Sequence, residues 1–380
     1  MSKLKIITVV GTRPELIRLS RIIAELNECF NHVLVHTGQN YDFELNKIFF
    51  NDLDIKIPDY YLDCFDENDS PAVKIGKMIS AIDPILESEK PDAFLILGDT
   101  NSALTSIAAK KRKIPIFHYE AGNRCFDQRV PEENNRKITD HLADINLTYS
   151  SISKNYLIQE GFPIDRIIKI GSPMMEVLNF YSSKFLNNSI ILNKLNVEKN
   201  GYFLISCHRE ENIDDNEQFD KFCDLLVHLS KKYDKKIIVS THPRTQKKID
   251  NSKKVFSDSI VFSKPFSFTD YITLQINSAL VLSDSGTINE EASILKFNAI
   301  NIRSTHERPE AVEECPTIMS SFDLSTIDQA INLFKINNFN EHFPSNVVSD
   351  YNIEVVSKKI SRIILSYIGF VNSYVWRKKS

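Results

Sequence analysis

Short runs of mostly β-branched hydrophobic residues alternate, in the first half of the chain, with segments whose hydrophobic residues recur at helical spacing. The short runs predict buried strands, and segments such as Pro14–Leu26 and Thr100–Lys111 predict amphipathic helices. This alternation is typical of a doubly wound parallel sheet. The predicted strands are Leu4–Val10, Val33–His36, Ala93–Leu97, Ile114–Phe117 and Ile145–Leu147.

A polar, Asn-rich stretch from Asn187 to Asn200 interrupts the alternation, which resumes with helices predicted over Asn216–Lys231 and Gly286–Leu295. We therefore expect an α/β protein with two Rossmann-like domains, residues 1–185 and 186–352, facing across a cleft that is a favoured place for a ligand. Ile353–Trp376 predicts a long amphipathic packing helix. The strands predicted in the second half are Tyr202–Cys207, Lys236–Ser240, Ile260–Phe262, Ala279–Leu282 and Ala299–Ile302.

Composition adds limits to this picture. The chain has 380 residues, which is more than one ordinary core accommodates. Its net charge of -4 provides no basic field for nucleic acid. Six cysteines without a CxxC pair indicate reduced thiols and a cytoplasmic location. We expect no signal peptide, because the first hydrophobic run is too short, and no membrane span, because polar residues interrupt the C-terminal hydrophobic segment.

The segment from His118 to His141 combines carboxylates and arginines around a Gly-Asn turn directly after a predicted buried strand. Ligands of open parallel sheets bind beyond the carboxyl ends of the strands, so the segment predicts an active-site wall. Within it, Arg136 is expected to pair internally with Glu133 or Asp140. Gly98-Asp99-Thr100 ends a neighbouring strand, where Asp99 could cap a helix, face a ligand, or do both. The His, Asp and Glu spacing matches no standard metal site, so we predict none.

Other predicted strand ends carry residues suited to an anion. Gly11–Glu15 opens one helix, and Ser283–Thr287 precedes a helix that carries Glu291. Backbone N–H groups at a helix start attract phosphate. His208 and His242 follow two further strands, where each could reach a ligand or be satisfied within a turn. Together these features predict a diphosphate ligand and acid–base chemistry.

The motifs GTRPE, GDT, HYEAGNR, VPEE, CHREEN, SDSG and ERPEAV, in this order along nearly the whole chain, resemble the non-hydrolysing UDP-N-acetylglucosamine 2-epimerase family. The resemblance implies a glycosyltransferase-B fold whose C-terminal helix, within residues 353–380, crosses back to the first domain. It also implies a UDP-sugar substrate, bound mainly by the second domain, and a homodimer. We expect no cofactor and no metal.

The resemblance further implies roles for individual residues. Asp99, Glu120 and Glu132 match the family's catalytic carboxylates, and are the candidate proton carriers for the two faces of the sugar ring. His208 matches its catalytic histidine. The residues expected to bind the UDP-sugar are Arg13, Arg18, Arg124, His242, Phe266, Ser285, Gly286, Thr287, Glu291 and Arg308.

The run NRCFD and the segments GSPMMEVL and SDSGTINEEASIL are similar to one branch of the family. That branch inverts C2 of UDP-2-acetamido-2,6-dideoxy-L-talose, giving UDP-N-acetyl-L-fucosamine for capsule or O-antigen. Arg18 in place of Lys, and Thr287 in place of Gly, also depart from the parent pattern. The parent activity giving UDP-N-acetylmannosamine, a hydrolysing epimerase, a retaining glycosyltransferase and a UDP-sugar sensor stay open as alternatives.

Overall fold

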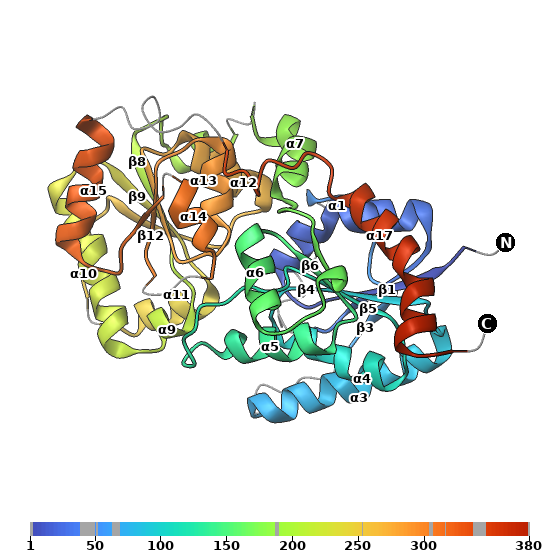
Figure 1. Ribbon diagram of the computed structural model, residues 1–380. Coiled ribbons are helices and arrows are strands. Elements are labelled where there is room, and N and C mark those ends of the chain that lie inside the picture. Colours follow the sequence, from blue (N-terminus) through green and yellow to red (C-terminus); the bar gives the residue numbers. More distant parts are fainter. Residues whose placement is uncertain are drawn as a thin grey trace. The chain divides into compact units, whose positions relative to one another are not determined.

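The computed structural model describes residues 3–38, 50, 52–62, 69–186, 190–252, 254–303, 307–315, 317–336 and 347–378. The chain divides into two compact units (Figure 1), one made of Met1–Asn179 with Asn352–Ser380 and one of Phe180–Tyr351. Each unit contains a parallel sheet, of seven strands in the first and six in the second. Both sheets place hydrophobic strand residues in a buried core.

The first sheet has the strand order β3-β2-β1-β4-β5-β6-β7. The order reverses between β1 and β4, so the connections that follow these two neighbouring strands diverge, which is where doubly wound sheets bind ligands. The strands are β1 Lys5–Val10, β2 Asn31–His36, β3 Tyr60–Tyr61, β4 Ala93–Leu97, β5 Ile116–Tyr119, β6 Ile145–Thr148 and β7 Ile167–Lys169.

The second sheet has the order β10-β9-β8-β11-β12-β13 and reverses in the same way between β8 and β11. Its switch point therefore lies where the connections after these two strands diverge. The strands are β8 Tyr202–Ser206, β9 Lys236–Ser240, β10 Ile260–Ser263, β11 Leu280–Ser283, β12 Ala299–Asn301 and β13 Ile318–Met319.

Helices connect the strands of both units. In the first unit they are α1 Arg13–Cys29, α3 Pro71–Glu89, the 3₁₀ turn η1 Asn101–Thr105, α4 Ser106–Lys111, α5 Pro131–Leu142, α6 Ser151–Gln159, the 3₁₀ turn η2 Ile164–Arg166, α17 Ser357–Phe370 and the π-turn η3 Val371–Val375. α7, Met174–Phe185, continues into the second unit. The second unit adds α8 Ile190–Leu195, α9 Glu210–Ile213, α10 Asn216–Lys232, α11 Pro243–Asp250, α12 Phe268–Asn277, α13 Ile288–Leu295, α14 Pro309–Glu314 and α15 Leu324–Ile336.

The predicted α/β class is confirmed, with local differences. The strand predicted at Ile114–Phe117 lies two residues later, because Lys113 adopts a left-handed turn with φ 57° before it. His118 is therefore a buried strand residue and does not belong to a loop. The helix predicted over Gly286–Leu295 begins at Ile288, and the polar stretch Asn187–Asn200 contains α8.

The C-terminal helix α17 returns to the first unit and packs against α1 (Figure 1), as predicted. Its amino end is held by Glu176 of α7, whose carboxylate accepts the backbone N–H groups of Val356 and Ser357, each at 2.8 Å. A carboxylate at this position also complements the helix dipole. Within the described ranges, no helix is both long and apolar enough to cross a membrane.

Candidate active site

The turn between β1 and α1 is locked by Glu15, which is buried. Its carboxylate accepts the backbone N–H groups of Gly11 and Thr12, at 2.6 and 2.7 Å, and the hydroxyl of Thr100 at 2.6 Å. Burial raises the pKa of Glu15, against the lowering effect of these bonds. Because Thr100 follows β4, Glu15 joins the two connections at the first switch point. Arg13, the first residue of α1, is partly exposed beside them.

Glu120 directly follows β5 and is 7% exposed. Its backbone φ of 71° lies in the left-handed region, which is uncommon for a residue with a side chain and recurs at functional sites. Its carboxylate pairs with Arg18 of α1. A Cβ atom at Gly98 would lie 3.1 Å from Glu120 Oε2, so the glycine makes room for this carboxylate.

Asp99 follows β4 and is bound by Arg136 of α5. The guanidinium Nε and Nη2 atoms lie 2.8 and 2.7 Å from Asp99 Oδ2. Arg136 Nη1 also lies 2.9 Å from Glu133, which is fully buried. Burial would raise the pKa of Glu133, but the Cys125 N–H and Arg136 hold it below its ordinary value. The predicted ion pair between Arg136 and Glu133 is confirmed, whereas no sequence pattern indicated the bond to Asp99.

Glu132 lies in the first turn of α5, which begins at Pro131. Proline suits this position because the first N–H groups of a helix have no partner within it. Glu132 is partly exposed and the adjacent Glu133 is buried. Of these two acids, Glu132 is therefore the one that a ligand can contact.

Asp140 is fully buried and organises the turn after β5. It lies 2.8 Å from His118 Nδ1 and 2.8 Å from Arg124 Nη1, and it accepts the N–H of Gly122. Burial would raise the pKa of Asp140, but His118 and Arg124 hold it below its ordinary value. Arg124 also binds Glu160 at 2.6 Å and its side chain is 0% exposed. This gives Arg124 a structural role, and its contact with the sugar stays a prediction.

In the second unit, His208 and Asp284 meet at the switch point between β8 and β11. His208 Nδ1 lies 3.1 Å from Asp284 Oδ1, and the His208 side chain is 42% exposed. The carboxylate of Asp284 also accepts the N–H groups of His208 and Arg209, each at 2.9 Å. Burial would raise the pKa of Asp284, but His208 and these bonds hold it well below its ordinary range. Orienting Nδ1 in this way leaves Nε2 as the ring atom available to a ligand.

The predicted phosphate turn, Ser285 to Thr287, leads directly into α13. The hydroxyls of Ser285 and Thr287 lie 3.0 Å apart, and Ser285 Oγ accepts the Thr287 N–H at 3.3 Å. A Cβ atom at Gly286 would lie 3.1 Å from Glu307 Oε1, so the backbone packs closely against that acid. The turn thus has the small, polar composition that suits an anion at a helix start.

Two other predicted ligand contacts are largely buried here. Glu291 is 7% exposed and accepts a hydrogen bond from Gln275 Nε2 at 2.6 Å. Arg308 is the N-cap residue of α14 and lies 3.0 Å from Glu290, with 3% of its side chain exposed. Glu291 lies in the first turn of α13 and Arg308 directly precedes α14, and their contacts with a ligand stay predictions.

His242 and Phe266 complete the predicted set. His242 follows β9 and is partly exposed, and Phe266 packs at the margin of the core cluster that contains Leu274 and Ile288. The structure thus gathers Asp99, Glu120 and Arg18 around the first switch point, and His208 with Ser285 and Thr287 around the second. In the described parts of the chain, no group of three His, Cys, Asp or Glu side chains is arranged to hold a metal ion.

The sequence indicated most of these positions but not Glu15, Asp140 and Asp284 as their supports. The role of Glu15 could have been predicted from the sequence, because an acid three residues after the Thr12 cap is typical of a capping box. Asp140 and Asp284 reach partners from other elements, and no local pattern reports such pairs.

A model of UDP-N-acetylglucosamine 2-epimerases matches residues 24–365 of the chain. A solved structure of UDP-N-acetylglucosamine 2-epimerase from Rickettsia bellii is 49% identical with a TM-score of 0.90, covering 99% of this chain and 100% of that one. The chain belongs to the UDP-N-acetylglucosamine 2-epimerase family. A family member from Methanocaldococcus jannaschii is 34% identical over 339 residues, which are 87% of this chain and 92% of that protein.

A solved structure of the Methanocaldococcus jannaschii UDP-GlcNAc 2-epimerase, in complex with UDP-GlcNAc and UDP, is also similar to the chain. It is 32% identical with a TM-score of 0.87, covering 96% of this chain and 100% of that one. Membership in the 2-epimerase family makes the protein an isomerase with the glycosyltransferase-B-like epimerase fold. These relatives carry the parent family's name, so they support the family and give no support to the narrower L-fucosamine branch.

Proposed function

We propose that the protein interconverts UDP-N-acetylglucosamine and UDP-N-acetylmannosamine by inverting C2 of the sugar without releasing it. The similar proteins described above are named for this substrate, and one was solved with UDP-GlcNAc and UDP. The observation that carries the proposal is the pair of arginine-bound carboxylates, Asp99 and Glu120, at the switch point of the first sheet. This pair provides acid–base groups where doubly wound sheets bind ligands.

The chemistry requires departure of UDP before C2 can lose its proton. The bond between C1 and the diphosphate oxygen breaks, and its electron pair leaves with UDP. A base then takes the C2 proton, and the C2–H electrons form the C1–C2 double bond of a 2-acetamidoglycal. An acid returns a proton to C2 on the opposite face, and UDP adds back to C1. The reaction therefore needs a proton carrier on each face and cations at the diphosphate.

Asp99, Glu120 and Glu132 are the proposed proton carriers. Arg136 binds Asp99 and Arg18 binds Glu120, and Glu132 is the partly exposed acid in the first turn of α5. Holding such groups in position lowers the entropic cost of reaching the transition state.

The proposed diphosphate contacts come mainly from the second unit. His208 would use Nε2, because its Nδ1 faces Asp284. The departing UDP gains negative charge, so the N–H groups at the start of α13 and the positive groups would stabilise it. The remaining proposed contacts with the UDP-sugar are Arg13, Arg18, Arg124, His242, Phe266, Ser285, Gly286, Thr287, Glu291 and Arg308.

A second candidate is the 6-deoxy-L-talose substrate, and Phe126 favours it. This residue of the NRCFD run is 65% exposed, has φ 56° and packs edge-on against Tyr156 with ring centroids 5.3 Å apart. An exposed ring held by the turn would suit a C6 methyl group better than a hydroxymethyl group, because only the methyl is fully apolar.

Offering both nucleotide sugars separately, with NMR of the C1 and C2 protons, decides between these candidates. The proposal predicts that UDP-N-acetylglucosamine gives UDP-N-acetylmannosamine and that no free sugar appears. Inversion of the 6-deoxy-L-talo substrate alone would establish the second candidate, and free N-acetylmannosamine would reveal a hydrolysing enzyme. Binding of both without turnover would contradict the epimerase function.

A further inference from the structure

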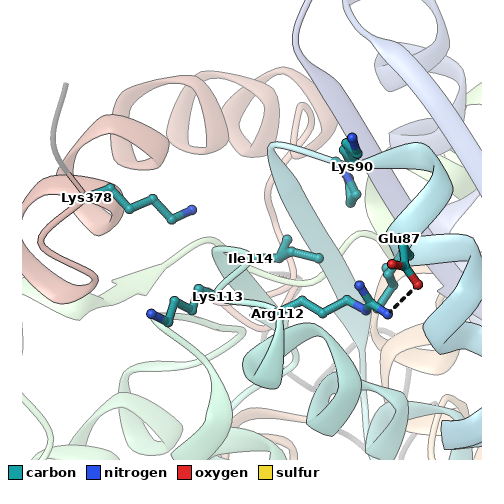
Figure 2. A pocket seen from close by; sticks show the side chains of 8 residues that line it. Glu87, Lys90, Arg112, Lys113, Ile114 and Lys378 are labelled. Carbon is teal, nitrogen blue, oxygen red and sulfur yellow. Dashed lines mark hydrogen bonds and ion pairs between the residues drawn. The ribbon is translucent and has the colours of Figure 1, made fainter.

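A basic pocket of about 320 Å³ lies in the first unit (Figure 2), away from the candidate catalytic carboxylates. Its wall includes Pro91, just before β4, and Ile114, just before β5. Asp99 follows the opposite end of β4, and a strand of that length spans about 17 Å. The pocket therefore lies at the amino ends of the strands, where none of the proposed UDP-sugar contacts is found.

Four cations line this pocket. Lys90 follows α3, Arg112 and Lys113 follow α4, and Lys378 follows the C-terminal π-turn. Arg112 is neutralised by Asp83 at 2.5 Å and by Glu87 at 3.2 Å. By contrast, the amino groups of the three lysines make no hydrogen bond or ion pair with the residues that the structure describes. The pocket thus carries positive charge that its own wall does not balance.

The backbone of Lys378 is held by the turn before it, and its side chain is exposed. Its backbone N–H donates to Asn372 at 2.9 Å, and neighbouring Trp376 packs 5.1 Å from the amino group of Lys110. Burial lowers the pKa of Lys378, and the charge of Lys113 lowers it further. The charges of Asp92 and Asp144 act in the opposite direction. The charge of Lys113 thus disfavours the charged form of Lys378, and an anion bound near both amino groups would offset this effect.

We propose that this pocket binds a small phosphate-bearing anion. Phosphate carries close to two negative charges and several acceptor oxygens, and lysine and arginine are its usual partners. Leu86 and Ile114, both buried, give the pocket an apolar side, and its volume lies at the lower end for small-molecule sites. The proposed anion is thus small, and its site is separate from that of the UDP-sugar.

Methyl NMR of isoleucine-labelled protein, titrated with inorganic phosphate, tests the proposal. The protein is first saturated with UDP, so that phosphate does not report on the proposed nucleotide site. The Ile114 methyl signal, assigned with Ile114→Val, should shift saturably. The double variant Lys113→Gln/Lys378→Gln should weaken phosphate binding about tenfold or more.

The matched control is the double variant Lys194→Gln/Lys199→Gln, which removes two exposed lysines of the second unit. It should leave the titration unchanged, which separates a local effect from a change in net charge. An Ile114 signal that does not shift saturably would overturn the proposal. So would equal phosphate affinity in the wild type and the double variant.

Discussion

At the residue scale, two of the three candidate carboxylates, Asp99 and Glu120, are each bound by an arginine that is distant in the sequence. Asp99 and Arg136 are 37 positions apart, and Glu120 and Arg18 are 102 apart. Motifs at strand ends indicated the acids, because parallel strands bring their carboxyl ends to one edge. They could not indicate these pairs, since the pairing depends on how α1 and α5 pack against the sheet.

Arg136 bridges Asp99 and Glu133, so we predict that it positions the catalytic carboxylate. Arg136→Lys keeps the charge but loses the planar fork that reaches both acids. The expected result is a fall in kcat of about tenfold or more with KM little changed, because the misplaced group acts in the transition state. Steady-state kinetics of the epimerisation give both values.

Arg129→Lys is the matched control, since Arg129 lies just before α5, its side chain is 84% exposed, and among the described residues it pairs with the nearby Asp127. It should retain wild-type kcat and KM. A kcat of Arg136→Lys similar to that of the wild type would show that Arg136 does not position Asp99. Equal losses of kcat in both variants would indicate a general disturbance of this part of the chain.

At the element scale, strands with a long hydrophobic run were predictable and short edge strands were not. β4 was predicted to the residue, because five buried hydrophobic residues in sequence have few alternatives. β3 has two residues and β13 has two, and such short runs look the same as loops. Their existence depends on a neighbouring strand that offers hydrogen bonds.

β2 contains two buried histidines, His32 and His36, that couple the stability of this sheet to pH. His32 Nε2 lies 2.8 Å from Thr8 Oγ1, and Nδ1 lies 2.7 Å from Asn27 Oδ1. Burial lowers the pKa of His32 to about 3, with the charge of Lys56 acting in the same direction. Burial also lowers the pKa of His36 to about 4. The folded state therefore binds fewer protons than the unfolded state between these values and about pH 6.5.

The neutral forms of the two histidines therefore favour the folded state. Their contribution to stability is complete above about pH 6.5 and declines as the pH falls toward 3. We predict that the free energy of unfolding of the first unit falls by about 2 kcal/mol per histidine between pH 6.5 and 5. His32→Gln should remove about half of that decline. Urea unfolding followed by the fluorescence of Trp376, the single Trp of the chain, reports on this unit.

His141→Gln, at an exposed position of α5, should leave the pH dependence as in the wild type. If the free energy of unfolding of His32→Gln declined with falling pH as steeply as that of the wild type, His32 would not be responsible for the pH dependence.

At the scale of the whole molecule, the alternation of strands and helices was sufficient to predict two α/β units, and the order of motifs was sufficient to predict the family. The relatives confirm that family and its fold. The sugar was not predictable in the same way, because Arg18, Thr287 and the NRCFD run depart from the parent pattern whereas the proposed catalytic acids match it. Discrimination between such similar sugars rests on differences of about 1–3 kcal/mol.

The central claim is that the enzyme inverts C2 through elimination and re-addition of UDP, with Asp99 as one of its proton carriers. The most direct test is NMR of the reaction in deuterated water. We predict one deuterium at C2 of the product, with traces of free UDP and the glycal. Asp99→Asn should lower turnover by about 10²–10⁴-fold and still bind UDP. Product that retains its original C2 proton would contradict the mechanism, and undiminished turnover of Asp99→Asn would remove Asp99 from it.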